Sequence, residues 1–257
     1  MQTSQTRAYP NRLNWRCENL LTRNLDSVRG KRILDLGSHD GRFSYACLRL
    51  GAKHVTGIEG RPQLVQHANE NLLGLDCRAE DFRFIEGDMF DCLPRLNAGE
   101  FDTVLCLGIF YHTIRQVELL RELRRLRPRN LVLDTNVSRE RFSFKLDSLL
   151  GRIRGKRSLP PEEARLSKAF QGAYLQFRRE NHRGEGSTGS TIDPVGMAAI
   201  PTKPLVELLL ESHGFRFREI RWKEAGISDW THLHDYRKGK RVSYIAQMDP
   251  GDCEIRF

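Results

Sequence analysis

The chain has 257 residues, of which 39% are apolar, enough for one sizeable core or for a core domain with an inserted cap. No run approaches the roughly 20 apolar residues of a membrane-spanning helix, and the first residues lack the apolar stretch of a secretion signal, so we expect a cytoplasmic protein without membrane contact. The six cysteines form no Cys-x-x-Cys pair, so we expect no metal site. The net charge of +9 favours anionic partners.

Residues 1–29 predict a helical cap that precedes the first strand. Leu13, Cys17, Leu20 and Leu21 recur there at helical spacing, and we expect this helix to pack over the edge of the sheet. After this cap, short apolar runs alternate with helical patterns, which predicts βαβ units and a mostly parallel sheet. The expected strands cover residues 32–36, 54–59, 82–85, 101–110, 130–134, 215–222 and 241–248.

The expected helices are recognised by apolar spacing and by the residues at their ends. Pro62 suits the first turn of the helix after the second strand, and Gly74 suits its end. Pro128 ends the helix before the fifth strand, because proline cannot donate a helical hydrogen bond. The helices are expected at residues 43–50, 62–74, 119–126 and 203–213.

The pattern of strands and helices breaks after the fifth strand. Residues 139–200 carry 12 Lys or Arg and 7 Asp or Glu, so they supply +5 of the net charge. They include the basic run 152–157 and the Gly- and Ser-rich stretch 183–191. Because a connection of this length is either functional or disordered, we predict an inserted, partly helical substrate lid in preference to a tolerated surface insertion. The core domain then comprises residues 30–138 and 201–257.

Acidic residues stand at the ends of three expected strands. Asp35 opens the loop Asp35-Leu-Gly-Ser-His-Asp-Gly41, whose glycines let backbone N–H groups and a helix N-terminus approach a polar ligand. Glu59 ends the second strand, where a carboxylate accepts hydrogen bonds from ribose hydroxyls in doubly wound folds. Asp88 follows the third strand beside the same crevice and suits an adenine amino group. Together the three predict a nucleoside site.

Each of these signals alone has an ordinary alternative. A glycine turn of this length occurs by chance, and an acid at a strand end is often only a helix N-cap. The combination of three favours the nucleoside site. The loop contains no Gly-x-Gly-x-x-Gly turn, which argues against a dehydrogenase, and the chain has no P-loop.

The order Asp35–Gly41, Glu59, Gly87-Asp88 and Phe101-Asp-Thr-Val-Leu-Cys-Leu-Gly-Ile-Phe-Tyr-His112 resembles the Rossmann-like class of S-adenosylmethionine-dependent methyltransferases. The resemblance covers most of the core domain and omits the insertion. It implies a doubly wound α/β fold with a mostly parallel, seven-stranded sheet and an antiparallel last strand. It also implies S-adenosylmethionine as the cofactor.

By this resemblance, Asp35 and the loop from Gly37 to Gly41 hold the methionine end of the cofactor. Glu59 holds the ribose, and Asp88 with Met89 holds the adenine. The family has glycine at the middle loop position where this chain has His39, which either replaces glycine in the turn or reaches toward the cofactor or substrate. The implied cofactor-binding residues are Asp35, Gly37, Ser38, His39, Gly41, Glu59, Gly60, Asp88, Met89 and Leu107.

Within that class, residues 101–112 are similar to the transfer-RNA carboxymethyltransferases that modify the wobble uridine, whose motif contains a similar Leu-Tyr-His. The similarity is local, and we carry over neither the substrate nor the carboxylated cofactor of that family. It implies only a position. Tyr111 and His112 are expected to face the methyl group at the end of the fourth strand.

The catalytic candidates follow from what methyl transfer requires. The enzyme must align the nucleophile and often remove its proton. His112 is the first candidate base, because imidazole has an ordinary pKa close to cellular pH. Its alternative is to position the substrate or to bond a backbone group. Tyr111 stands beside it, and Asp134 is a second candidate whose alternative is an ordinary cap or salt-bridge partner.

The acceptor is expected to lie under the lid. Tyr111, Asn136, His182 and Arg183 are the candidate substrate contacts. The leading hypothesis is methylation of an oxygen or nitrogen on a small, anionic metabolite, because an inserted lid encloses such a substrate and excludes water. The alternatives are an RNA methyltransferase, for which the basic insertion follows phosphates, and a non-catalytic binding subunit that keeps the fold.

Overall fold

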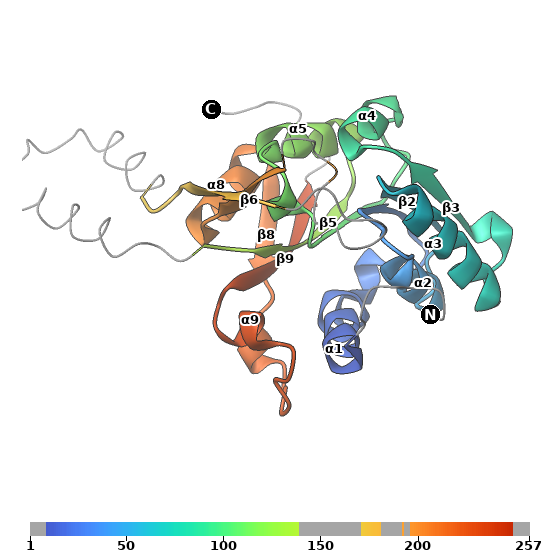
Figure 1. Ribbon diagram of the computed structural model, residues 1–257, viewed down its shortest axis with the longest axis horizontal. Helices are drawn as coiled ribbons and strands as arrows, with labels where there is room; N and C mark the ends of the chain where they lie inside the picture. The colour runs from blue at the N-terminus through green and yellow to red at the C-terminus, as the bar shows by residue number, and fades with distance from the viewer. Residues whose placement is uncertain (1–8, 139–170, 181–191, 193–195, 249–257) are drawn as a thin grey trace, which may run out of the picture.

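The computed structural model describes residues 9–138, 171–180, 192 and 196–248 (Figure 1). The basic run 152–157 and the Gly- and Ser-rich stretch 183–191 lie outside the described residues. The same holds for His182 and Arg183, so the predicted substrate contacts of these two side chains stay predictions.

Seven strands form one sheet in the spatial order β3-β2-β1-β4-β5-β9-β8. Strands β1 to β5 run parallel, whereas β9 pairs antiparallel with both β5 and β8. This arrangement confirms the predicted Rossmann-like α/β sheet with an antiparallel last strand. The strands are β1 Arg32–Leu36, β2 His54–Glu59, β3 Phe82–Glu86, β4 Thr103–Leu107, β5 Asn130–Asn136, β8 Phe215–Glu219 and β9 Arg241–Met248.

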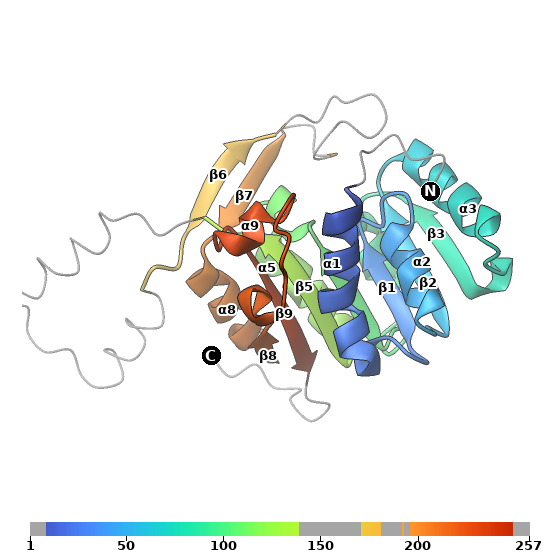
Figure 2. The same ribbon diagram turned by 90° about the horizontal axis from the view of Figure 1, so that it is seen from below.

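Helices cover both faces of the sheet (Figures 1 and 2). Side chains of α1, α2 and α9 share one hydrophobic core, and those of α4, α5 and α8 share the other. The helices are α1 Pro10–Leu20, α2 Arg42–Arg49, α3 Pro62–Gly74, α4 Met89–Cys92, α5 Gln116–Leu126, α8 Lys203–Ser212 and α9 His234–Arg237. Short 3₁₀ helices are η1 Thr22–Ser27, η2 Ala79–Asp81, η3 Leu93–Arg95, η4 Phe110–His112 and η6 Trp222–Glu224.

The alternation of side chains along the strands explains the two cores. In β1, Ile33 lies in the core under α1 and α2, whereas Leu34 and Leu36 lie in the core under α5. All three side chains are fully buried. A strand that is apolar on both faces is typical of the centre of a doubly wound sheet.

The N-terminal helix lies over the face of the sheet, and the prediction that it packs over the edge is wrong. Leu20 and Leu21 are fully buried and belong to the same core as Ile33 of β1 and Leu105 of β4. These two strands are central in the sheet, and Figure 2 shows α1 lying across that region. The face is apolar there and needs a cover, which α1 provides.

Strand β4 is shorter than predicted and ends at Leu107. Gly108 follows with φ of 94°, a backbone conformation that favours glycine, and its N–H donates to the carbonyl oxygen of Asp134. The chain then forms η4 above the carboxyl end of the sheet. The apolar residues after Leu107 therefore belong to a turn that presents Tyr111 and His112.

The described part of the insertion is a β-ribbon. Strand β6 (Leu175–Arg179) pairs antiparallel with β7 (Met197–Pro201), so β7 runs one residue past the predicted boundary. The predicted partly helical structure of the insertion concerns mainly residues outside the described ranges and stays a prediction. The ribbon is attached to the core through the buried Gln116, whose Nε2 donates to the carbonyl oxygen of Ala199 at 2.8 Å. Tyr174 N and the carbonyl oxygen of Gly172 bond the hydroxyl of Thr202.

Candidate functional site

The loop after β1 is held closely against the helices that follow it. Ser44 of α2 donates its hydroxyl to Asp35 Oδ2 at 2.7 Å. Gly41 is the N-cap of α2 with φ of 78°, and a Cβ there would lie 2.8 Å from Leu72 Cδ1. Both the backbone conformation and the neighbouring side chain therefore require glycine at position 41.

His39 adopts the backbone conformation of the glycine that it replaces. Its φ is 56°, in the left-handed region, and its backbone N–H donates to Glu59 Oε2 at 3.0 Å. The histidine therefore keeps the turn and uses its main chain to fix the carboxylate of the next strand. Its Nδ1 lies 3.4 Å from Oδ1 of the buried Asp40, which in turn pairs with Arg42.

Glu59 is nearly buried at the end of β2, with its carboxylate oriented by two backbone donors. Oε2 accepts from His39 N, and Oε1 accepts from Arg61 N at 3.1 Å. Oε1 also accepts from Nη1 of Arg61 at 3.4 Å, so a further lone pair remains on Oε2. This position on Oε2 can accept a hydroxyl group, so Glu59 suits a ribose hydroxyl.

Asp88 follows β3 and lies at the same end of the strands as Glu59. Gly87 N donates to the carbonyl oxygen of Glu59, so the two strand ends are joined directly. Asp88 is the N-cap of α4, and its Oδ1 accepts from Phe90 N at 2.8 Å. Asp88 therefore caps a helix, which is the ordinary role considered for it in the sequence. Its Oδ2 makes no hydrogen bond with the described residues. Met89 follows and packs partly buried against the core.

Burial raises the pKa of Asp35 to about 7. The hydrogen bond from Ser44 opposes this effect, and the negative charge of Glu59 adds to it. A carboxyl group with this pKa is poised to ionise when a positively charged ligand approaches.

A second cluster lies where η4 follows β4. His112 Nδ1 lies 2.6 Å from Glu180 Oε2, and the rings of Tyr111 and His112 are 4.0 Å apart. Glu180 directly follows β6, so the ribbon supplies the acid that orients the imidazole. Both side chains are largely buried. No hydrogen bond joins Nε2 of His112 to a residue in the described ranges.

Asp134 is fully buried near the carboxyl end of β5 and accepts hydrogen bonds from four side chains. Arg16 donates at 2.8 Å, Arg241 at 2.7 Å and Ser243 at 2.7 Å, and Tyr236 Oη lies 3.1 Å from Oδ2. Burial by itself would raise the pKa of Asp134, but the guanidinium groups of Arg241 and Arg16 outweigh it and lower that pKa. These contacts favour the structural alternative for Asp134.

The two arginines that meet Asp134 also approach the end of β4. A Cβ at Gly108 would lie 3.6 Å from Arg241 Nη1 and 3.8 Å from Arg16 Nη2. Arg241 Nη2 donates to Tyr111 Oη at 3.2 Å. Positive charge is therefore placed directly beside the side chains predicted to face the methyl group.

The remaining predicted residues lie along the same edge. Gly37 and the buried Ser38 are in the loop, and the carbonyl oxygen of Leu107 lies 3.5 Å from Arg16 Nη2. A Cβ at Gly60 would lie 2.5 Å from Cδ1 of Ile192, so this residue of the insertion covers the end of β2. Asn136 ends β5, and its side chain makes no hydrogen bond with any residue that the structure describes.

Sequence reasoning missed Arg16, Glu180 and Arg241. Arg241 had a usable signal, because an arginine that starts a buried strand must find a counter-charge. Arg16 and Glu180 stand among other charged residues and had none.

Two further observations concern the described residues only. None of their helices is long and apolar enough to cross a membrane. They contain no group of three or more His, Cys, Asp or Glu side chains arranged to hold a metal ion.

Residues 33–129 match the family described as a methyltransferase domain. The chain is 35% identical over 130 residues to a tRNA U34 carboxymethyltransferase of Cellvibrio japonicus, covering 49% of this chain and 38% of that protein. It is 34% identical over 86 residues to a protein of Methanocaldococcus jannaschii named as an N5-glutamine methyltransferase, covering 34% of this chain and 40% of that one. The chain thus spans well under half the length of these relatives.

Solved structures agree on the fold. The N-terminal domain of EvdMO1, crystallised with S-adenosylhomocysteine and D-fucose, superposes with a TM-score of 0.59 at 16% identity, covering 95% of this chain and 86% of that one. Residues 33–129 thus match a methyltransferase domain, and the fold is that of a protein crystallised with S-adenosylhomocysteine, the demethylated form of S-adenosylmethionine. The loop, Glu59 and Asp88 described above fit that cofactor.

Asp35 gives a pH-dependent prediction. Because its pKa in the fold is raised to about 7, its contribution to stability is fully present below its ordinary pKa and is lost as the pH rises through about 7. The cofactor carries positive charge and favours the ionised form, so its affinity should increase about tenfold from pH 6 to pH 8. Calorimetry of the wild type and of Asp35→Asn tests this. Equal pH dependence in the two proteins would contradict it.

Asp134→Asn should lower the free energy of unfolding by about 3–5 kcal/mol, because it leaves Arg16 and Arg241 buried without their shared counter-charge. The matched control is Glu118→Gln, which breaks the exposed pair with Arg115 and should cost less than about 1 kcal/mol. Urea unfolding measures both. Equal losses in the two variants would show that Asp134 is not the buried hub described above.

Proposed function

We propose that this chain transfers a methyl group from S-adenosylmethionine to an oxygen or nitrogen of its acceptor, with His112 as the general base. The observation that carries the proposal is the 2.6 Å contact between His112 Nδ1 and Glu180 Oε2 at the carboxyl end of β4. A carboxylate on one ring nitrogen fixes the tautomer and leaves the other nitrogen as the acceptor of a proton.

The cofactor would be held by the loop after β1, by Glu59 and by Asp88. It supplies a methyl group already activated by a positively charged sulfur. The chain therefore has to orient the acceptor and remove its proton. Glu59 is suited to the ribose by its two backbone donors, and Asp35 by its charge to the positive end of the cofactor.

Proton removal falls to the pair His112 and Glu180. With Nδ1–H donated to Glu180, Nε2 carries the lone pair that takes the acceptor's proton. The imidazolium that forms is stabilised by the adjacent carboxylate. Because Glu180 follows β6, the base is correctly oriented only when the ribbon lies against η4. Substrate enclosure and activation of the base are thereby linked.

The position of Arg241 favours a small, anionic acceptor. Its guanidinium reaches Tyr111 Oη beside His112 while it shares Asp134 with Arg16. Ile192 covers Gly60, so the insertion approaches the cofactor end of the crevice as well. A site covered in this way suits a molecule small enough to be fully enclosed.

RNA is the second candidate acceptor, and the surface of the ribbon favours it. Phe177 is 63% exposed on β6, and Arg178 and Arg179 follow it in exposed positions. An exposed aromatic ring with the guanidinium group of Arg179 on the same face of the strand suits base stacking and phosphate contact. The similarity to tRNA-modifying relatives points the same way, although it covers only 38% of the relative.

Transfer of a labelled methyl group to fractionated cell extract distinguishes the two acceptors. We expect incorporation in the small-molecule fraction, lowered about 100-fold or more by His112→Gln and strongly by Glu180→Gln, with cofactor affinity unchanged. Glu86→Gln, an exposed acid at the end of β3, is the matched control. If the cofactor binds but neither the small-molecule nor the RNA fraction is labelled, the proposal fails.

For RNA as the acceptor, Phe177→Ala should weaken binding of bulk RNA about tenfold, because one stacked base contributes roughly 1–3 kcal/mol. Leu73→Ala removes another exposed apolar side chain, on α3, and should leave binding unchanged. Binding should also weaken steeply with salt. Salt-independent binding, or equal effects of both substitutions, would exclude this acceptor.

A further inference from the structure

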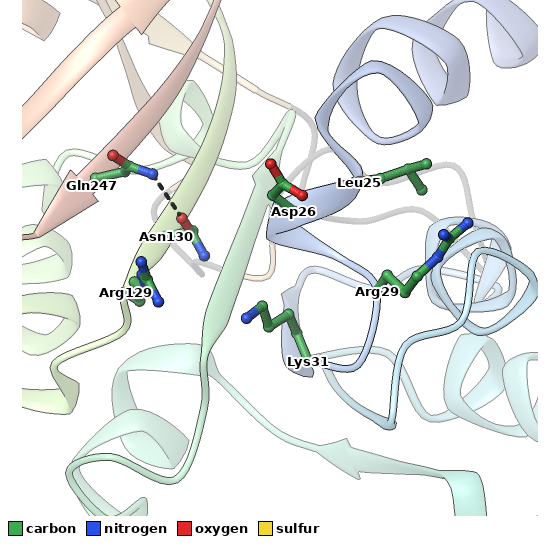
Figure 3. A pocket seen from close by; sticks show the side chains of 7 residues that line it. All are labelled: Leu25, Asp26, Arg29, Lys31, Arg129, Asn130 and Gln247. Atoms are coloured by element: carbon green, nitrogen blue, oxygen red, sulfur yellow. Dashed lines mark hydrogen bonds between the residues drawn. The ribbon is translucent and has the colours of Figure 1, made fainter.

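A separate cavity lies at the amino ends of the parallel strands. The loop after β1, Glu59 and His112 lie at the carboxyl ends of these strands. Its volume is about 420 Å³, within the range of small-molecule sites (Figure 3). It opens where β1 and β5 begin and where the antiparallel β9 ends. Its lining residues are Leu25, Asp26, Arg29, Lys31, Arg129, Asn130 and Gln247.

The charge of this cavity is strongly positive. Arg29, Lys31 and Arg129 surround it, and Asp26 is the one acid in its lining, so the local charge is +2. None of these three cations makes a side-chain hydrogen bond or ion pair with a residue of the described ranges. Arg32, the next residue after Lys31, is by contrast paired with Asp102. The cavity thus gathers cations that form no ion pair with the described residues, and of the three only Lys31 lies close enough to Asp102 to lower the pKa of that carboxyl group.

The backbone that carries these cations is held in place. Arg29 N donates to the carbonyl oxygen of Leu25, and Lys31 N to that of Val28. The carbonyl oxygen of Arg129 accepts from Met248 N, at the end of β9. The positions of the cations are therefore set by the sheet and by η1, and only their side chains need to adjust to a ligand.

The floor of the cavity is fixed by two amides, as Figure 3 shows. Gln247 Nε2 donates to Asn130 Oδ1 at 3.3 Å, and Asn130 Nδ2 donates to Thr103 Oγ1 at 3.2 Å. Asn130 and Gln247 are direct partners in the register of β5 and β9. This floor is polar and neutral, so a ligand placed there would be recognised by hydrogen bonds and by the surrounding positive charge.

We infer that this cavity binds a phosphate group. A phosphate dianion matches the local charge of +2, and guanidinium groups bind phosphate oxygens with two parallel hydrogen bonds. The strand β1 between this cavity and the cofactor loop has five residues, a separation of about 16 Å at about 3.3 Å per residue. The phosphate site is therefore distinct from the methyl-transfer site and does not depend on the proposed function.

Calorimetric titration with inorganic pyrophosphate tests the site on the full chain at low ionic strength. The double variant Lys31→Gln and Arg129→Gln should weaken binding about tenfold or more. The control variant Arg95→Gln and Lys238→Gln removes the same charge from exposed positions elsewhere and should stay within about twofold of the wild type. Cofactor affinity reports that each variant is folded and should not change.

Asp26→Asn gives a prediction of the opposite sign. It removes the acid that repels an anion and should tighten pyrophosphate binding about threefold, which damage to the fold would not do. If neither variant at the cavity changes the affinity beyond the control variant, the inference is overturned. Undetectable pyrophosphate binding to the wild type overturns it as well.

The same titration with a six-nucleotide RNA without terminal phosphates identifies the source of the phosphate. Binding that is tighter than that of pyrophosphate and is lost in the double variant identifies the backbone of a nucleic acid. Pyrophosphate binding lost in the double variant, with the RNA unaffected, identifies a free phosphorylated molecule. Either result supports the site, and both are independent of whether methyl transfer is detected.

Discussion

The hydrogen bonds of the buried Asp134 carboxylate hold together the segments at the carboxyl ends of the parallel strands. It accepts hydrogen bonds from α1 through Arg16, from β9 through Arg241 and Ser243, and from α9 through Tyr236. Its own strand lies between β4 and β9. Three parts of the chain, namely α1, β5 and the stretch from α9 to β9, therefore converge on one charge. Because that charge is buried, its partners cannot be exchanged for water without a large cost.

This hub also shapes the site above it. Arg241 can present Nη2 to Tyr111 because its Nη1 is held by Asp134 and its Nε by Asp235. The guanidinium is thus oriented before any acceptor arrives, and less ordering remains to be done on binding. The imidazole of His112 is oriented in a similar way, but by Glu180 from the insertion. The contacts that orient Arg241 thus come from the core, and the contact that orients His112 comes from the ribbon.

The sheet and its two cores could be predicted from the sequence, because they depend on local signals. Apolar strands alternate with amphipathic helices, and this pattern predicted the sheet. The acids predicted at the ends of neighbouring strands do lie close together, since Gly87 before Asp88 bonds the main chain of Glu59. The partners of Asp134 and His112 depend on contacts between segments more than sixty residues apart, as Glu180 is from His112. Such contacts produce no periodic pattern of residues in the sequence. The position of α1 over the face of the sheet could not be predicted, because the spacing of four apolar residues predicts a helix but not the surface that the helix covers.

The insertion leaves and re-enters the core at a single point, where Ser138 bridges to Thr202 and its N–H donates to the carbonyl oxygen of Pro201. Two chain ends already held together lose little further entropy when the segment between them changes in length or composition. Changes of length or composition between residues 138 and 202 are therefore expected to leave the sheet undisturbed, together with Glu59 at the end of its second strand.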